Sequence, residues 1–101
     1  MNTFDKVYNL VAKIPKGKVM TYGEISKIIG FDPRVVGFAL HANKDTNKIP
    51  CHRVIKANGK IANGYAFGGK DVQKEILKNE GVNFLDPETV DLKSSLYKAT
   101  F

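Results

Sequence analysis

The sequence predicts a mainly α-helical fold, namely a small helix-turn-helix (winged-helix-like) domain with a minimal β-hairpin wing. Apolar residues recur at helical spacing near residues 3–13, 21–29 and 33–42, which is the periodicity of amphipathic helices. Only a short turn that contains Gly30 separates the second and third segments, and such a pair is typical of a helix-turn-helix. A hairpin turn signal, Ala57-Asn58-Gly59, follows later in the chain and favours a short strand on each side of it.

The first helix is expected near residues 3–13, and the basic turn Pro15-Lys16-Gly17-Lys18 ends it. Its apolar stripe consists of Phe4, Val7, Tyr8 and Val11, widened by Leu10 and Ile14. A stripe of this width predicts a helix that packs against a core.

Capping residues delimit the two helices of the predicted helix-turn-helix. Thr21 and Glu24 have the spacing of a capping box, and Gly30 is a natural C-terminal stop. Asp32 is a good N-cap for a second helix over Pro33–Ala42, which we expect to be the recognition helix. Helix pairs of this kind also occur in proteins that never touch DNA, so the pattern alone is a weak signal.

Short strands and a glycine-rich loop are expected after the helix pair. Val54–Ile55 and Lys60–Ile61 are the predicted strands of the wing. The loop Gly64–Gly69 holds two aromatic residues but lacks the lysine-serine pair of a nucleotide-binding loop. A loop that wraps a flat substrate is the better interpretation.

The last clear helix begins at Lys70 or Asp71 and ends at Glu80-Gly81. The residues expected to face inward are Val72, Ile76 and Leu77. From residue 83 to residue 101 the periodicity breaks down, and we expect a tail that lies on the body of the protein.

Composition favours one intracellular domain, over residues 1–101, with a polyanionic partner. The formal net charge is +6, and the positive charge is almost all lysine because Arg34 and Arg53 are the only arginines. A basic small domain suggests nucleic acid, although a solvated lysine-rich surface is the alternative. The single cysteine, Cys51, excludes an internal disulfide and a cysteine-based zinc cluster. No apolar run approaches a membrane span, and the first six residues are not a signal peptide.

The segment Ile49–Ile55 holds that cysteine next to a histidine and an arginine, Cys51-His52-Arg53. A thiol becomes a strong nucleophile when an imidazole takes its proton and positive charge holds the thiolate. Pro50 restricts the backbone before the thiol, and the β-branched residues after it would anchor the site in a core. The alternative is a buried, inert cysteine, because an adjacent histidine does not prove a catalytic pair.

Taken together, these motifs resemble the C-terminal, active-site domain of the O6-alkylguanine-DNA alkyltransferases, the suicide DNA-repair proteins. The resemblance covers roughly residues 4–82 in one order, and such a joint match is far more specific than any single motif. The matching segments are Thr21-Tyr22-Gly23-Glu24-Ile25, Arg34-Val35-Val36-Gly37 with Ala39-Leu40 and Asn43, Pro50-Cys51-His52-Arg53-Val54, Gly64-Tyr65 with Gly68-Gly69, and Lys74-Glu75 through Leu77 and Glu80-Gly81.

The resemblance implies irreversible transfer of an alkyl group from guanine O6 to Cys51, once per molecule. His52 would take the thiol proton through a water, and Glu80 would orient the imidazole. Tyr22 would contact the target nucleotide and its 3′ phosphate and would donate a hydrogen bond to the leaving guanine. The base must be flipped out of the duplex for this chemistry. Neither a metal nor an organic cofactor is required.

The resemblance also implies which residues hold DNA and guanine. Arg34 would enter the base stack as the base leaves, and Asn43 would brace the recognition helix against the active-site turn. The other expected DNA contacts are Gly37, Phe38 and Arg53. The expected guanine pocket is lined by Pro50, Val54, Tyr65, Phe67 and Gly68. The implied partner is double-stranded DNA containing O6-alkylguanine, bound by a monomer in the cytoplasm (nucleoid-associated) or the nucleus, without a membrane.

The chain departs from the family pattern in three ways. It is expected to begin at the active-site domain, without the N-terminal domain of many members or the zinc site that some carry there. Phe38 stands where the family often has a small residue, which would alter the fit to the groove or probe the base stack. Ala66 and Phe67 stand where some members have a tyrosine and a serine, and Phe67 suggests an aromatic wall.

Two other functions stay open. The related alkyltransferase-like proteins are built from this domain alone, have Trp or Ala at the cysteine position, and bind alkylated DNA to recruit other repair factors. Cys51 argues against that assignment, whereas the single-domain length argues mildly for it. The third possibility is a simple DNA-binding regulator in which Cys51 is structural.

Overall fold

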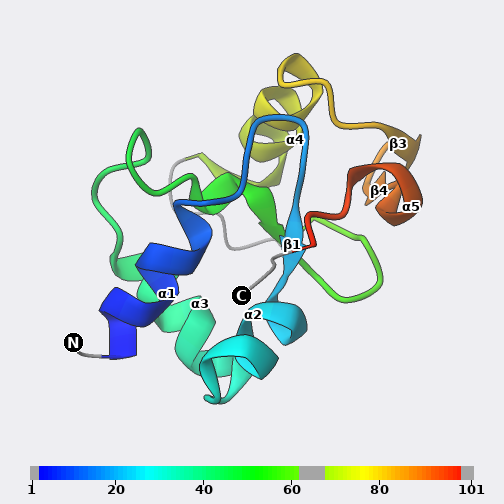
Figure 1. Cartoon of the computed structure of the whole chain (residues 1–101). Helices are drawn as coiled ribbons and strands as arrows, with labels where there is room; N and C mark the ends of the chain where they lie inside the picture. The colour runs from blue at the N-terminus through cyan, green and yellow to red at the C-terminus, as the bar shows by residue number, and fades with distance from the viewer. Residues whose placement is uncertain (1–2, 62–67, 99–101) are drawn as a thin grey trace.

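Figure 1 shows the computed structural model of the protein, which describes residues 3–61 and 68–98. Its elements are α1 (Thr3–Val11), β1 (Met20–Thr21), α2 (Tyr22–Ile29), α3 (Pro33–Ala42), a 3-10 turn (Cys51–Arg53), β2 (Val54–Ile55), α4 (Gly69–Asn79), β3 (Phe84–Asp86), β4 (Thr89–Val90) and α5 (Leu92–Ser95). Helices predominate, as predicted. No helix within the described ranges is long and apolar enough to cross a membrane.

Helices α2 and α3 form the predicted helix-turn-helix, and α1 packs against both (Figure 1). The Thr21 hydroxyl accepts a hydrogen bond from the Glu24 amide at 3.1 Å, and the Asp32 carboxylate accepts one from the Arg34 amide at 2.8 Å. Gly30 ends α2 with a φ of +81°, a conformation that favours glycine. The predicted helix pair and its capping residues are therefore confirmed.

One apolar cluster lies between these helices and the short strands, and the thiol of Cys51 belongs to it. Its buried members are Val7, Leu10, Val11, Ile14, Met20, Ile25, Val36, Ala39, Leu40, Cys51 and Val54. Burial of such side chains is the main favourable term in folding. Because Cys51 shares this core with residues of α1, α2 and α3, packing from all three helices holds it in position.

The strand pairing differs from the expected wing. β2 pairs in parallel with β1, in the register Met20↔Val54 and Thr21↔Ile55, and not with the segment Lys60–Ile61. The turn before that segment does form, because the Lys56 amide donates to the Lys60 carbonyl at 3.0 Å. The chain then pairs with β4, through an antiparallel bridge between Lys60 and Thr89. The predicted pairing of β2 with Lys60–Ile61 is therefore wrong. β2 pairs with β1 instead, and Lys60 pairs with Thr89 of β4.

The segment after residue 82 packs onto the body, as expected for the tail, but it has regular structure of its own. β3 and β4 form an antiparallel hairpin. Leu96 bridges in parallel to Val19, and the Tyr97 amide donates to the Val19 carbonyl at 2.8 Å. A second apolar cluster, made of Val19, Ile55, Leu77, Val82 and Val90, joins this segment to α4 and β2.

Candidate active site

Cys51 occupies the first position of a 3-10 turn that leads directly into β2. Its amide donates to the Ile49 carbonyl at 2.8 Å, and the Arg53 amide donates to the Pro50 carbonyl at 2.9 Å. The side chain is only 5% exposed. Tyr22, the first residue of α2, packs against the same cluster. The backbone therefore holds the thiol at a fixed point beside the start of the helix-turn-helix.

Asn43 connects the end of α3 to this turn. Its side-chain amide donates to the Ile49 carbonyl at 3.0 Å, and its side-chain oxygen accepts from the Asp45 amide at 3.0 Å. The residue is buried. The bracing contact expected for Asn43 is thus present in the structure, and it acts through the backbone two residues before Cys51.

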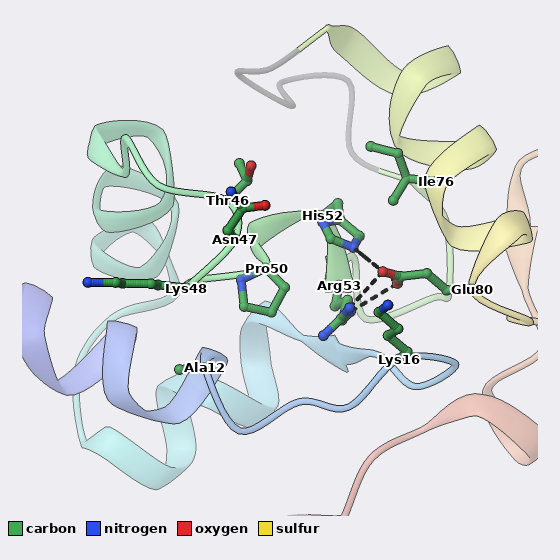
Figure 2. Close-up of a pocket in the computed structure, with 10 residues that line it drawn as sticks. All are labelled: Ala12, Lys16, Thr46, Asn47, Lys48, Pro50, His52, Arg53, Ile76 and Glu80. Carbon is green, nitrogen blue, oxygen red and sulfur yellow. Dashed lines mark hydrogen bonds and ion pairs between the residues drawn. The ribbon is translucent and has the colours of Figure 1, made fainter.

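His52 and Glu80 form the central polar pair of the site. Figure 2 shows both His52 and Arg53 pointing at the Glu80 carboxylate. The His52 Nε2 atom lies 3.0 Å from each carboxylate oxygen. His52 lies on the 3-10 turn and Glu80 directly follows α4, so the packing of α4 onto the turn brings them together.

Arg53 completes this group from the other side. Its Nε and Nη2 atoms donate to the two oxygens of Glu80 at 2.9 Å and 2.6 Å, and Nη1 donates to the Ile14 carbonyl at 2.7 Å. The guanidinium is buried. This placement corrects the expectation that Arg53 contacts DNA, because its charged end is turned inward and paired. Paired carboxylate and guanidinium groups of this geometry are strongly directional.

The charges in this group set its protonation state. Burial would raise the pKa of the Glu80 carboxyl, but the hydrogen bonds from Arg53 and His52 outweigh it and hold that pKa below its usual value. Burial lowers the pKa of the His52 imidazole; Glu80 opposes this shift, and Arg53 adds to it. At neutral pH the carboxylate is therefore ionised and the imidazole neutral.

These states fix the tautomer of His52. Because the carboxylate can only accept hydrogen bonds, Nε2 must carry the proton that it donates to Glu80. Nδ1 then has a free lone pair, and this buried atom has no hydrogen-bond partner within residues 3–61 and 68–98. A neutral imidazole held in this way is suited to accept a proton at Nδ1.

The thiol and the phenol beside it are both protonated at neutral pH. Burial raises the pKa of the Cys51 thiol, although hydrogen bonds from the Asn43 side chain and from the local backbone partly oppose the shift. Burial also raises the pKa of the Tyr22 hydroxyl, and the nearby Cys51 adds to it. A reaction at Cys51 therefore needs a base, while Tyr22 stays a hydrogen-bond donor.

Gln73 is a site residue that sequence reasoning missed. It is 2% exposed, and its side-chain amide donates to the His52 carbonyl at 2.9 Å and to the Val54 carbonyl at 3.3 Å. Val72, which we expected to face inward, is instead 41% exposed. On the inward face of α4, Gln73 therefore takes the place expected for Val72, while Leu77 is buried as predicted. A polar residue gives no apolar periodicity by which to find it.

Helix α3, the expected recognition helix, presents a second group of predicted residues to solvent. The side chain of Arg34 is 84% exposed, and Phe38 is 65% exposed. An open apolar hollow of about 600 Å³ is lined by Arg34, Gly37, Phe38, His41 and Ala42. Val36, Ala39 and Leu40 are buried on the opposite face, so α3 has a core face and an outer face.

A second hollow, of about 360 Å³, lies against the His52–Glu80 pair (Figure 2). Its lining residues are Ala12, Lys16, Thr46, Asn47, Lys48, Pro50, His52, Arg53, Ile76 and Glu80. Lys16 and Lys48 are exposed and make its rim basic. The hollow therefore borders Pro50 and His52, the two residues that flank Cys51 in sequence.

The remaining expected pocket residues are only partly described. Pro50 and Val54 lie on either side of the 3-10 turn and are buried. Gly68 immediately precedes α4. Tyr65 and Phe67 lie outside the described residues. Within the described ranges, no three His, Cys, Asp or Glu side chains are grouped so that they could hold a metal ion.

Sequence comparison finds a family match and curated relatives. Residues 2–82 match the family described as 6-O-methylguanine DNA methyltransferase, DNA binding domain. A methylated-DNA–protein-cysteine methyltransferase of Saccharolobus solfataricus is 49% identical over 76 residues, which are 75% of this chain and 48% of that protein. The corresponding protein of Candida albicans is 42% identical over 77 residues, 76% of this chain and 43% of its own length. The chain thus spans about half the length of these curated relatives.

Two kinds of solved structure are similar to this one. S. pombe Atl1, in complex with damaged DNA containing O6-carboxymethylguanine, has a TM-score of 0.81 at 33% identity and matches 98% of this chain and 100% of that chain. Mycobacterium tuberculosis O6-methylguanine methyltransferase has a TM-score of 0.69 at 36% identity and matches 80% of this chain and 49% of that chain. The first likeness therefore extends into the segment after residue 82.

Proposed function

This chain belongs to the 6-O-methylguanine DNA methyltransferase, DNA binding domain family, and from this premise we propose that it acts in DNA repair by transferring an alkyl group from guanine O6 to Cys51. The observation that carries the proposal is the arrangement of Cys51 directly before His52, with Nε2 of His52 3.0 Å from Glu80. This is the order of nucleophile, base and orienting group that thiol chemistry requires.

Binding would begin at the outer face of α3. Duplex DNA would lie along α2 and α3, and the alkylated guanine would rotate out of the stack toward Cys51. Arg34, whose side chain is 84% exposed, would occupy the gap left by the base. Unstacking costs a few kcal/mol, and an inserted side chain offsets part of that cost.

The extruded guanine would be held between the 3-10 turn and the glycine-rich segment. Pro50 and Val54 supply backbone on either side of the turn that begins with Cys51, and Tyr65, Phe67 and Gly68 are proposed to complete the pocket. Gln73 would contribute indirectly, because it fixes the carbonyls of His52 and Val54. Fixed polar groups of this kind orient a flat base by its edge.

Transfer would then proceed by displacement at the alkyl carbon. The thiol proton passes to Nδ1 of His52 through a water, and Sγ of Cys51 forms a bond to the alkyl carbon as its bond to guanine O6 breaks. The electron pair of that bond goes to guanine, where the Tyr22 hydroxyl donates a hydrogen bond to the developing charge. Glu80 stabilises the imidazolium that forms.

The product is a thioether, which has no hydrolysable bond. Each molecule would therefore act once, and the stoichiometry of transfer would not exceed one alkyl group per protein. The chemistry requires neither a metal nor an organic cofactor. A duplex DNA substrate implies an intracellular setting, in the cytoplasm or the nucleus, and a monomer suffices because all proposed groups come from one chain.

The test is intact mass after incubation with duplex DNA that carries one O6-methylguanine, followed by peptide mapping. We expect a gain of one methylene on the peptide that holds Cys51, with no further gain at excess DNA. Cys51→Ser should abolish the gain while it leaves DNA binding in place. Absence of any mass gain in the wild-type protein would overturn the proposed transfer.

The likeness to S. pombe Atl1 over 98% of this chain favours one further candidate function, that of a non-catalytic sensor of alkylated DNA. A sensor would bind the lesion more tightly than plain DNA and recruit other repair factors. The same experiment separates the two functions, because a sensor would show preference for the lesion without a mass gain. Equal binding to both duplexes would leave only a simple DNA-binding regulator with a structural Cys51.

A further inference from the structure

We propose that Phe38 is a second, apolar wedge on α3, which enters the groove of duplex DNA on the same helix face as Arg34 and holds open a base step about two base pairs from the extruded base. The inference rests on the proposed binding of duplex DNA by this helix, and it does not require transfer to Cys51. It assigns a DNA-contacting function to a bulky aromatic residue at a position where the family often has a small one.

The exposure of Phe38 is not explained by the fold. Its neighbours on the core side of α3, Val36, Ala39 and Leu40, are at most 6% exposed, whereas Phe38 is 65% exposed. A large apolar side chain on an outer helix face gains nothing from water. Because the exposed ring also lines an open apolar hollow, the two together form an apolar patch of the kind that serves as a contact surface.

The surroundings of Phe38 suit the approach of a flat, negatively charged partner. The hollow of about 600 Å³ beside it is lined by Arg34, Gly37, His41 and Ala42, with no acidic side chain among the lining residues. Nothing lies within 4 Å of the position that a Cβ on Gly37 would take. The helix backbone next to the ring is therefore open to close contact.

The spacing of Arg34 and Phe38 assigns them different places in the duplex. Residues four apart on a helix lie on one face, about 6 Å from each other, and stacked base pairs are about 3.4 Å apart. If Arg34 fills the gap left by the extruded base, the ring of Phe38 reaches a step about two base pairs away. The ion pair of Arg34 with Asp32 is long, at 3.5 Å, and exposed, so it does not hold Arg34 back.

The chemistry of the ring identifies what it contacts. A phenyl group has no charge and no hydrogen-bond donor, so it gains nothing from phosphate oxygens. Apolar side chains that bind DNA do so by inserting between base steps, which they partly unstack. Such a wedge would make it harder for the extruded base to return and would raise the population of flipped lesion.

The proposal is tested by measuring DNA affinity against salt for Phe38→Ala and Arg34→Ala. We expect Phe38→Ala to weaken binding to lesion duplex about tenfold, with an unchanged slope of log affinity against log salt, because no counterion is involved. Arg34→Ala should reduce that slope by about one. Phe38→Leu, which stays apolar, should restore most of the affinity.

The position of the wedge is read from 2-aminopurine placed about two base pairs from the lesion. Wild-type protein should raise its fluorescence, and Phe38→Ala should not. The matched control is Leu85→Ala, because Leu85 is 70% exposed and apolar but lies on β3, far from α3 in Figure 1. Leu85→Ala should change neither the DNA affinity nor the 2-aminopurine fluorescence. The exposure of Phe38 also predicts that the melting temperature of Phe38→Ala matches the wild type.

The outcomes separate this proposal from the proposed transfer. Loss of the 2-aminopurine signal in Phe38→Ala supports the wedge even if the wild-type protein transfers no alkyl group. Equal affinity and equal fluorescence for wild type and Phe38→Ala overturn the wedge even if transfer to Cys51 is normal. A reduced salt slope in Phe38→Ala would also overturn it, because the residue would then act through phosphate contacts.

Discussion

The Nε2 atom of His52 lies 3.0 Å from both carboxylate oxygens of Glu80, although the two residues are 28 positions apart in the chain. Arg53 donates to the same two oxygens. One carboxylate at the end of α4 therefore fixes the two residues that follow Cys51. This relationship makes Glu80 both a structural anchor of the 3-10 turn and the group that sets the tautomer of the imidazole.

Glu80→Gln is expected to slow transfer about 10²-fold, which is the low end of a general-base contribution. The side-chain oxygen of glutamine can still accept a hydrogen bond from Nε2, but the uncharged amide cannot stabilise the imidazolium. Because Glu80 raises the pKa of His52 against the effect of burial, its loss should move the acidic limb of the rate–pH profile to lower pH. Single-turnover kinetics across that pH range measure both effects.

The control for this variant is Glu75→Gln, on the exposed side of the same helix. It removes the same charge from α4 without touching His52 or Arg53, and it should leave rate and profile unchanged. If Glu80→Gln shifted the acidic limb upward, or not at all, the orienting role of Glu80 would be contradicted.

Acidification is expected to destabilise the folded protein in two steps. The folded-state pKa values of His52 and Glu80 are both lowered, from ordinary values of 6.5 and 4.5. The unfolded chain therefore binds protons first, so stability is full above pH 6.5 and falls as pH drops below it, first through His52 and then through Glu80. Urea unfolding from pH 8 down to about pH 3 covers both steps, and a stability that rises on acidification would contradict the prediction.

Local chemistry explains which parts of the fold were predictable from the sequence. Thr21, Gly30 and Asp32 act on backbone within a few residues, so the caps and the stop of the helix pair can be predicted from sequence alone. Strand pairing depends on segments distant in sequence, and Met20 at the register of Val54 has no local signal. That is why the pairing expected for β2 was wrong.

The same distinction applies to the site. The order of Cys51 and His52 is visible in the sequence, but their link to Glu80 entered only through the family resemblance. Arg53 carries a charge that favours a surface position, and only the folded structure shows that Glu80 and the Ile14 carbonyl take up its donors. Gln73 was missed because a buried polar residue interrupts the apolar pattern by which helix faces are predicted.

Gln73→Met is expected to reduce the free energy of unfolding by about 1–2 kcal/mol, because the carbonyls of His52 and Val54 lose their buried donor. Methionine keeps the volume of the side chain, so packing contributes little to the change. Transfer should slow as well, since the turn that carries Cys51 is less firmly held. Denaturant unfolding and single-turnover kinetics on one preparation measure both quantities.

The matched control is Val72→Ala on the adjacent, 41% exposed position, which should change stability less than Gln73→Met does. The opposite order would mean that the inward face of α4 includes Val72, and the structural placement of Gln73 would then be contradicted.

Asn43→Ala is expected to make the Cys51 thiol less reactive while it destabilises the end of α3. Hydrogen bonding from the Asn43 side chain opposes the burial that raises the pKa of the thiol, so its removal should raise that pKa further and leave less thiolate at a given pH. The Ile49 carbonyl and the Asp45 amide lose their partner, at a cost of about 1–3 kcal/mol.

The rate of alkylation by iodoacetamide, measured against pH on fully folded protein, reports the thiolate fraction. Asn47→Ala in the same loop serves as the control, because the side chain of Asn47 is exposed and its hydrogen bond to the Asp45 carboxylate is donated by the backbone amide. A thiol that reacts as fast in Asn43→Ala as in Asn47→Ala would show that Asn43 does not act on Cys51.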